Sequence, residues 1–394
     1  MSEVVQTYEV KNGKLVDDSL FVRQQVANYL METTPSGLVL VGYENDDSSL
    51  EVPVEALKAV ELFISTGVDV GQARACLVPE LSLMAKRLQA AACFVTDSFC
   101  FLDSEGCYLN GTLPIRRIEK GKRGKSLSLD LQREYMRYLR KEVVVDRLNS
   151  ISVAIAGLKD KTLFNLLSQV IPLRGLWRVR SDGEASVNSI RDSVLRLNAN
   201  IGVKLDSTGT KAVFIADNGV VIKTEEAAAL IARYLKEQGS LKEKVARDWN
   251  ISRFFDKVAE KSGLKVAGEA VFHVGEEIIY HAHLGVGDGL WLTFLLCEII
   301  AVTERPLSEL IEEMHKVVGK RETKSINLSQ EQLIGFLKRL TGKQYSILAK
   351  GEVLIDDDVV AWQKLDNNSY SVFLDGRETR LQSWLNSLSL DISL

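Results

Sequence analysis

The chain has 394 residues, of which 46% are hydrophobic and 26% charged, and it contains only 6 prolines. Because domains usually run to about 100–200 residues, this length predicts more than one folded unit, and the composition excludes a long disordered chain or a fibrous repeat. Lys and Arg total 49 against 53 Asp and Glu, so the formal net charge of −4 gives no reason to expect nucleic acid or an anionic membrane as a partner.

The N-terminal segment, MSEVVQTYEVKNGK, lacks a basic flank followed by an apolar core, and no apolar run in the chain is long enough to cross a bilayer. We therefore expect a cytoplasmic protein with no membrane segment. The cysteines are odd in number and form no C-x-x-C pair, so buried free thiols are expected. They are Cys76, Cys93, Cys100, Cys107 and Cys297.

Short apolar runs alternate with helical patterns in the first part of the chain. Residues 38–41 form an apolar run bounded by Gly37 and Gly42, which is typical of a buried strand. The alternation continues, which predicts a parallel sheet covered by helices. The further elements expected are a helix at 54–65, a strand at 68–70, a helix near 79–91, a strand at 91–95, and a basic, glycine-rich, solvated loop at 119–125.

A second α/β unit is expected from about residue 142, after a helix near 131–139. Asp217-Asn218-Gly219 is a turn sequence and predicts a hairpin. A helix should follow at 224–237, with Thr224 as its N-cap and Glu226 in its first turn. The other elements predicted in this unit are strands at 143–145, 169–171, 202–205, 212–215 and 220–223 and helices near 161–167 and 189–197.

The last two units are smaller. From about residue 241 we expect helices near 251–261 and 289–302, and beyond Gly319 a helix, strands and a second helix. The chain would then divide into an α/β domain at 1–141, a second at 142–240, a shortened third at 241–318 and an α+β domain at 319–394.

One late segment carries the strongest motif. Val286-Gly-Asp-Gly-Leu290 enters a long apolar helix, and Glu304-Arg-Pro-Leu-Ser-Glu-Leu310 follows one helix later. This pattern resembles the (T/G)-G-D-G-L and G-K-P-L-S-E-L segments of the phosphoglucomutase/phosphomannomutase (α-D-phosphohexomutase) family. The resemblance implies three α/β units with mixed sheets and a small C-terminal α+β domain. Because Asp288 can cap the helix and Leu307 can be buried, the segment indicates fold rather than activity.

Residues 201–219 are similar to the family's metal loop, G-I-A-x-D-G-D-A-D-R. The resemblance implies that three aspartates of this loop bind Mg²⁺, since a hard cation prefers several charged oxygen ligands. Those positions are Asp206, Thr208 and Thr210 here, and the family's arginine is Lys211. Asp206 is therefore the one metal ligand carried over, and poor affinity for Mg²⁺ is expected. An ordinary hairpin with Asp206 at its turn is the simpler interpretation.

Residues 93–101, CFVTDSFCF, stand where the family has its T-A-S-H-N-P serine loop. Thr96 and Ser98 align with the Thr of that loop and with the serine that carries the phosphoryl group, so they are candidate catalytic residues together with Lys211. Phosphoryl transfer depends on charge neutralisation and positioning, so a serine without metal and cations has little catalytic value. The His, Asn and Pro of the family's loop are replaced by Phe99, Cys100 and Phe101.

Two further regions are candidates for substrate binding. Val274-Gly-Glu-Glu277 resembles the family's G-E-(E/Q/M)-S-G sugar-reading loop, which makes Gly275 and Glu276 candidate sugar contacts. Residues 374–381 stand near the position of the family's R-P-S-G-T-E-P phosphate loop, although solvated arginines are the more economical interpretation. The candidates there are Arg377, Thr379 and Arg380. His281 and His283 have no third ligand at a recognisable spacing and are expected to be strand residues.

Three functions are compatible with these residues. The first is a catalytically degenerate phosphohexomutase that binds a hexose phosphate or a protein partner without isomerising it. The second is a divergent active mutase that transfers phosphate between C1 and C6 of a hexose phosphate through Ser98, with Mg²⁺ on Asp206. The third is a structural or regulatory subunit whose cleft is closed by Phe99 and Phe101. Mg²⁺ is required only by the second, and a homo-oligomer is compatible with each. The active-site losses favour the first.

Overall fold

The computed structural model describes residues 7–15, 19–44, 52–114, 123–158, 161–179, 186–242, 244–268, 270–343, 350–366 and 369–392. The chain forms two compact units, the first from Met1–Ile222 with Glu277–Ser308 and the second from Lys223–Glu276 with Glu309–Leu394. Each unit therefore combines segments that are distant in sequence. In the part of the chain described here, no helix is both long and apolar enough to cross a membrane.

The first unit begins with an eight-stranded mixed sheet in the order β7-β1-β2-β6-β5-β3-β4-β8. Its central strand β3 (Leu38–Tyr43) runs parallel to both neighbours, β4 (Asp69–Ala75) and β5 (Ala91–Val95). This confirms the predicted parallel sheet, with α2 (Val54–Ser65) and α3 (Val78–Leu88) as connections. The remaining elements are β1 (Thr7–Lys11), β2 (Lys14–Leu15), α1 (Leu20–Thr33), β6 (Phe99–Leu102), β7 (Gly111–Pro114), β8 (Ser126–Ser128) and α4 (Leu131–Glu142).

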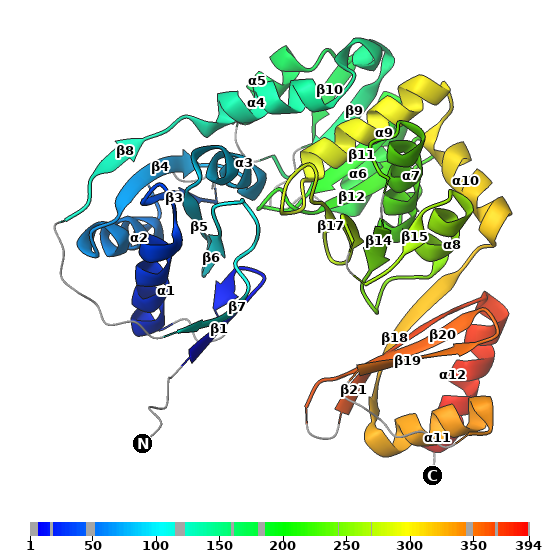
Figure 1. Cartoon of the computed structure of the whole chain (residues 1–394). Helices are drawn as coiled ribbons and strands as arrows, with labels where there is room; N and C mark the ends of the chain where they lie inside the picture. Colours follow the sequence, from blue (N-terminus) through cyan, green and yellow to red (C-terminus); the bar gives the residue numbers. More distant parts are fainter. Residues whose placement is uncertain are drawn as a thin grey trace, which may run out of the picture. The chain divides into compact units, whose positions relative to one another are not determined.

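The core of this region lies between the first sheet and the helices α1 and α2, which are next to each other in Figure 1. It includes Val26 and Leu30 of α1, Phe63 of α2 and the rings of Phe99 and Phe101 from β6. Apolar residues at helical spacing on α2 and in alternation on the strands account for this packing. The two phenylalanines therefore stabilise the N-terminal domain from inside.

A second sheet in the same unit has the order β10-β9-β11-β12-β13. β9 is parallel to β10 and β11, whereas β11, β12 and β13 form antiparallel pairs. The predicted hairpin around Asp217 to Gly219 is confirmed as the turn between β12 and β13. The bounds are β9 (Ser152–Ala156), α5 (Lys161–Val170), β10 (Gly175–Arg178), α6 (Val187–Leu197), β11 (Ile201–Leu205), β12 (Ala212–Ala216), β13 (Val221–Ile222), β17 (Ile278–Tyr280) and α9 (Gly289–Thr303).

Two strands predicted in this region are wrong. Val145–Ser150 forms a 3₁₀ helix, and the first strand of the sheet starts only at Ser152. The Val144 N–H donates to the Glu298 carboxylate at 3.0 Å instead of to a neighbouring strand. Residues 169–171 mostly continue α5, which ends at Val170. The β-branched residues at 143–145 and 170–171 have a local preference for strands, but tertiary packing determines the structure that they adopt.

The second unit contains a short parallel arrangement and an antiparallel sheet. β14 (Lys244–Arg247) is parallel to β15 (Lys265–Val266) and to β16 (Phe272–Val274). The C-terminal sheet has the order β18-β21-β20-β19, and α11 and α12 pack on it through one hydrophobic core (Figure 1, orange and red). The bounds are α7 (Thr224–Glu237), α8 (Phe254–Lys261), α10 (Leu307–Val318), β18 (Glu322–Ser329), α11 (Gln330–Thr341), β19 (Lys350–Ile355), β20 (Asp358–Lys364), β21 (Ser369–Gly376) and α12 (Glu378–Ile392).

The start of α7 differs by one residue from the prediction. Lys223 is the N-cap, and Thr224 is already the first helical residue. The Glu226 carboxylate accepts a hydrogen bond from the Lys223 N–H at 2.9 Å, as expected of an acidic residue in a first helical turn. The C-terminal tail also begins with a strand, β18, before its first helix.

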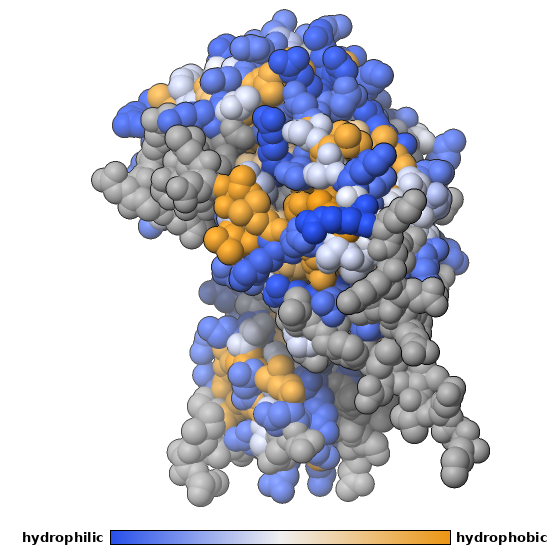
Figure 2. All heavy atoms as spheres, turned by 90° about the vertical axis from the view of Figure 1, so that its left-hand side faces the viewer, coloured by the Kyte–Doolittle hydropathy of each residue, from blue (hydrophilic) through white to orange (hydrophobic). Residues whose placement is uncertain are grey.

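The fold class confirms the sequence expectation of mixed α/β sheets followed by a C-terminal antiparallel sheet domain. The boundaries at 141, 240 and 318 stay a prediction. On the face drawn in Figure 2, hydrophobic surface occurs in small groups among hydrophilic residues. Scattered exposed apolar residues such as Val54 and Leu57 are ordinary in globular proteins, so they identify no binding face by themselves.

Candidate functional site

The loop between β11 and β12 is closed by its own hydrogen bonds. The Asp206 carboxylate accepts the Lys211 N–H at 3.0 Å and the Thr208 hydroxyl at 2.5 Å. The hydroxyls of Thr208 and Thr210 lie 2.9 Å apart, and Thr210 is buried. Gly209 adopts a φ of 76°, and a Cβ at this position would lie 2.9 Å from the Leu77 side chain, so only glycine fits the turn.

Glu277, which lies just before β17, completes this network. Its carboxylate accepts the Thr210 hydroxyl at 2.9 Å and the Gly287 N–H at 3.0 Å. The Tyr108 hydroxyl also donates to it, at 2.9 Å and 3.1 Å from the two oxygens. Burial raises the pKa of Tyr108, and the negative charge of Glu277 raises it further, so this hydroxyl stays a proton donor. Glu277 was missed by sequence reasoning, because nothing local distinguishes it from Glu276.

This set of oxygen atoms does not fit a Mg²⁺ site of the three-carboxylate kind. Mg²⁺ requires near-octahedral oxygen ligands at about 2.0–2.1 Å and charge compensation by carboxylates. Here the network has two carboxylates, Asp206 and Glu277, and both accept hydrogen bonds from threonine hydroxyls. Within the described residues, no group of three or more His, Cys, Asp or Glu side chains could hold a metal ion. Both carboxylates therefore already accept hydrogen bonds from hydroxyls, whereas a cation would need their free lone pairs.

Thr96, Asp97 and Ser98 form the tight turn between the antiparallel strands β5 and β6. Val95 pairs with Phe99 across it. The Thr96 N–H donates to the Ser98 carbonyl at 3.0 Å, and the Ser98 N–H donates to the Thr96 hydroxyl at 3.3 Å. The structure thus brings the two candidates of the serine loop together. In the described part of the chain, no hydrogen bond joins Ser98 to Asp206, Thr208 or Thr210.

The phenylalanines after Ser98 do not line a surface. Phe99 and Phe101 are 2% and 0% exposed, and their rings lie 6.1 Å apart in the core. The guanidinium of Arg23, from α1, stacks over the Phe99 ring at 4.0 Å. The expectation that these two rings close a cleft is therefore wrong: β6 alternation directs them into the domain interior.

Comparisons with known proteins identify the relatives of this fold. No family model matches the chain. A stretch of 173 residues is 28% identical to phosphoglucosamine mutase of Anoxybacillus flavithermus, and it covers 39% of this chain and 39% of that protein. The chain matches about two fifths of the length of such curated relatives.

Solved structures match over nearly the whole chain. A phosphoglucomutase/phosphomannomutase family protein from Burkholderia thailandensis superposes with a TM-score of 0.71 and 15% identity, and the match covers 98% of this chain and 95% of that one. An Aspergillus fumigatus N-acetylphosphoglucosamine mutase in complex with glucose 1,6-bisphosphate superposes with a TM-score of 0.50 and 12% identity over 98% and 94% of the two chains. The chain is therefore similar in sequence to phosphoglucosamine mutases over about two fifths of its length, and it has the fold of phosphoglucomutase/phosphomannomutase family proteins.

The residues predicted to form a sugar-reading loop lie in the second unit, at the carboxyl end of β16. Gly275 is buried, and a Cβ there would lie 2.3 Å from the Asp248 carboxylate, so this close approach needs a glycine. His273 Nε2 lies 3.3 Å from the same carboxylate. The hydrogen bond from His273 lowers the pKa of Asp248. Glu276 is exposed.

The two histidines singled out in the sequence are not strand residues. His281 and His283 follow β17 in a turn. His283 is buried between the rings of Tyr138 and Trp291, at 5.1 Å and 4.1 Å between centroids. Its Nε2 lies 2.9 Å from the Asp288 carboxylate. It therefore supports the start of α9, which Asp288 caps by accepting the Trp291 N–H, as predicted.

The residues predicted to form a phosphate loop lie between β21 and α12 or at the start of α12. Arg377 and Thr379 are exposed, and the Arg377 carbonyl accepts the first hydrogen bonds of α12. Arg380 is bound by two carboxylates, Asp356 at 2.7 Å and Asp358 at 3.1 Å. These hydrogen bonds raise the pKa of Arg380, so its guanidinium stays charged, and the two carboxylates balance that charge. Arg377 is therefore the candidate cation whose side chain is exposed to solvent.

Proposed function

We propose that this chain is a catalytically degenerate phosphohexomutase that binds a hexose phosphate without transferring the phosphoryl group. The observation that carries the proposal is the closed network of Asp206, Thr208, Thr210, Glu277 and Tyr108. Its hydroxyl hydrogens satisfy the carboxylates that would otherwise attract a cation.

The chemistry explains why this network opposes turnover. Phosphoryl transfer spreads negative charge over several oxygens, so catalysis rests on positioning and on cations that neutralise this charge. The proposed nucleophile, Ser98, sits in a three-residue turn in which its own N–H and carbonyl form hydrogen bonds with Thr96. Without a metal ion beside it, its hydroxyl has neither activation nor charge compensation.

We infer a hexose phosphate as the ligand from the similar proteins and from one exposed arginine of this chain. A structurally similar mutase is complexed with glucose 1,6-bisphosphate. In this chain, Arg377 is exposed at the start of α12, where a guanidinium and the helix N-terminus both favour an anion. A protein partner instead of a sugar phosphate is the outcome that a failed binding test would favour.

The catalytic part of the proposal is tested with glucose 1-phosphate, glucose 1,6-bisphosphate and Mg²⁺. We expect no glucose 6-phosphate above the background, and no increase in mass at Ser98 by intact-protein and peptide mass spectrometry. The Ser98→Ala variant is the matched control and should behave identically. Turnover by the natural chain that Ser98→Ala abolishes would overturn the proposal.

The binding part is tested separately by thermal unfolding. Glucose 1,6-bisphosphate should raise the unfolding temperature, because a ligand that binds only the native state stabilises it by mass action. The Arg377→Ala variant should lose most of this shift. An unchanged unfolding temperature in the natural chain would contradict hexose phosphate binding and leave the catalytic result unaffected.

A further inference from the structure

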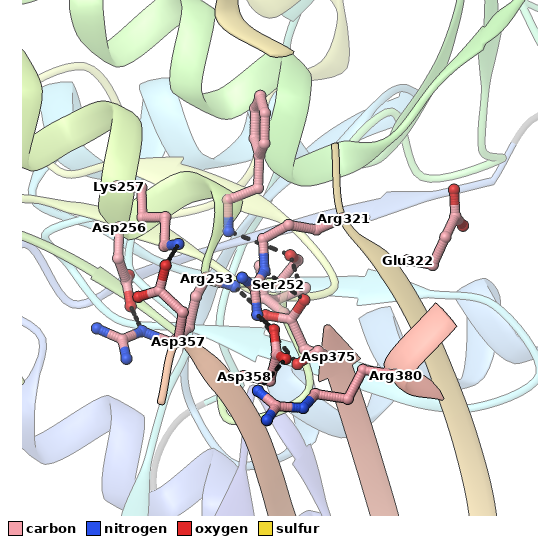
Figure 3. A network of polar contacts seen from close by, with 12 residues as sticks. Ser252, Arg253, Asp256, Lys257, Arg321, Glu322, Asp357, Asp358, Asp375 and Arg380 are labelled. Carbon is pink, nitrogen blue, oxygen red and sulfur yellow. Dashed lines mark hydrogen bonds and ion pairs between the residues drawn. The ribbon is translucent and has the colours of Figure 1, made fainter. Parts of the chain in front are cut away.

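An aspartate of the second unit is surrounded by hydrogen-bond donors of three kinds. Asp375, at the end of β21, is 0% exposed. Its carboxylate accepts the Ser252 hydroxyl at 3.1 Å, the Arg253 N–H at 2.7 Å and the Arg321 Nε–H at 2.8 Å. Figure 3 shows these side chains converging on the same point. The Arg321 guanidinium also donates to the Asp375 carbonyl at 3.0 Å, so it holds both the backbone and the side chain.

The three donors make up an anion cradle. A hydroxyl, a backbone N–H at the start of α8 and a guanidinium are groups that proteins use to bind anions, and the helix N-terminus adds partial positive charge. The Phe254 N–H donates to the Ser252 hydroxyl at 3.1 Å and so orients that hydroxyl toward Asp375. The cradle is filled by a carboxylate of the chain itself.

The cradle joins parts of the second unit that are far apart in sequence. Ser252 and Arg253 precede α8, Arg321 lies in the link between α10 and β18, and Asp375 belongs to the C-terminal sheet. Asp358 extends the network, since its carboxylate lies 3.3 Å from Arg321 and accepts Arg380 at 3.1 Å. A continuous network of ion pairs and hydrogen bonds therefore connects the start of α8 with α12.

A second ion pair between α8 and the C-terminal sheet is more exposed. The Lys257 ammonium donates to Asp357 at 2.6 Å, but the Asp357 side chain is 64% exposed, so this ion pair is screened by solvent. The Asp375 cradle differs because its charges are desolvated. Burying such charges gains little net stability, but removing one partner is strongly unfavourable, so the pairing selects one arrangement.

We propose that Asp375 is a latch that holds the C-terminal sheet against α8 by acting as the internal anion of this cradle. The latch fixes the link 319–321 through Arg321, whose neighbour Lys320 has an exposed side chain. The residues of the cradle itself are not among the candidates for hexose phosphate binding, so the latch is tested separately from the proposed function. They are Ser252, Arg253, Arg321 and Asp375.

The test is limited trypsin digestion of the full chain under native conditions, with cleavage after Lys320 followed by mass spectrometry. Cleavage there needs local opening of the link, so the cleavage rate measures how firmly Asp375 and Arg321 hold the link closed. In Asp375→Ala we expect cleavage at least about tenfold faster than in the natural chain, because the Ser252 hydroxyl, the Arg253 N–H and Arg321 lose their buried acceptor, and Asp358 alone is left to balance the Arg321 charge. Asp375→Asn, which keeps the size and loses the charge, should also accelerate cleavage.

The matched control is Asp357→Ala, which removes the exposed ion pair between α8 and the same sheet. We expect its cleavage rate to stay within about twofold of the natural chain. An unchanged rate in a folded Asp375→Ala variant would overturn the latch. If Asp375→Ala does not fold, Asp375→Asn decides alone, and an unchanged rate there has the same meaning. Equal acceleration by Asp357→Ala would also overturn it.

Discussion

Glu277 and Glu276 are neighbours in sequence but differ in their surroundings. Glu276 is exposed, whereas the Glu277 carboxylate accepts hydrogen bonds from the Tyr108 hydroxyl, the Thr210 hydroxyl and the Gly287 N–H. These donors come from three separate segments, so one side chain organises the candidate metal loop. Buried donors that lose their acceptor are costly, which makes Glu277 the most informative single residue of the site.

Replacing Glu277 by alanine should destabilise the protein. The change leaves the hydroxyls of Tyr108 and Thr210 and the Gly287 N–H without their acceptor, and we expect a loss of about 2–3 kcal/mol in the free energy of unfolding. Urea unfolding followed by circular dichroism measures it. Glu276→Ala is the control and should change the free energy by less than about 0.5 kcal/mol. Equal losses in both variants would refute this role of Glu277.

At the scale of elements, the start of α9 is tied to α4 through a buried polar group. Asp288 caps α9, and its carboxylate also accepts the Tyr135 hydroxyl of α4 at 2.7 Å. His283 lies between them, and its Nδ1 lies 2.9 Å from the Tyr138 hydroxyl of the same helix. A helix that is hydrophobic on all sides, as α9 is, must be buried, and this cluster provides partners for the Asp288 carboxylate and for the Trp291 backbone N–H at the start of the helix.

The stability of the protein should fall as pH rises through the titration of His283. Burial lowers the pKa of His283, but the carboxylates of Asp288 and Glu142 raise it by more, so the folded-state pKa lies above the ordinary value. A raised pKa contributes stability that is fully present below about pH 6.5 and is lost as pH rises through the folded pKa.

Urea unfolding at a series of pH values measures this effect. The natural chain should lose stability relative to the His283→Gln variant as pH rises through the folded pKa of His283. Parallel curves for the two proteins over the whole range would show that His283 does not titrate with folding.

At the scale of the whole molecule, a ligand that binds the native state raises the stability of the chain according to its affinity and concentration. The candidate metal loop has one carboxylate, Asp206, and two hydroxyls, Thr208 and Thr210, at its three proposed ligand positions. We therefore expect the same unfolding temperature in millimolar MgCl₂ and in EDTA, measured by calorimetry at constant ionic strength.

A variant with Thr208→Asp and Thr210→Asp tests whether the missing carboxylates are the reason. It should be less stable than the natural chain in EDTA, because like charges are brought together, and MgCl₂ should raise its unfolding temperature. A rise with MgCl₂ in the natural chain that Asp206→Ala abolishes would contradict the expectation.

The amino-acid sequence by itself determined the features that depend on near neighbours. Apolar runs and helical spacing predicted β3, α2, β5 and α9 to within a few residues, and Asp288 was identified as a cap from its position before an apolar helix. The resemblance to the family's metal loop, with threonines at 208 and 210, also came from the sequence, and it stays a prediction. Local preference failed where packing outweighed it, as at the 3₁₀ helix Val145–Ser150.

Only the tertiary structure decided which distant side chains meet. Glu277 contacts Tyr108, and Asp375 contacts Ser252, across more than a hundred residues in each case. Such pairs have no periodic signal, because their geometry depends on how whole sheets and helices pack. The same reason explains why the core position of Phe99 was missed: an apolar residue is suited to a core or to a cleft, and only the neighbours it packs against distinguish the two.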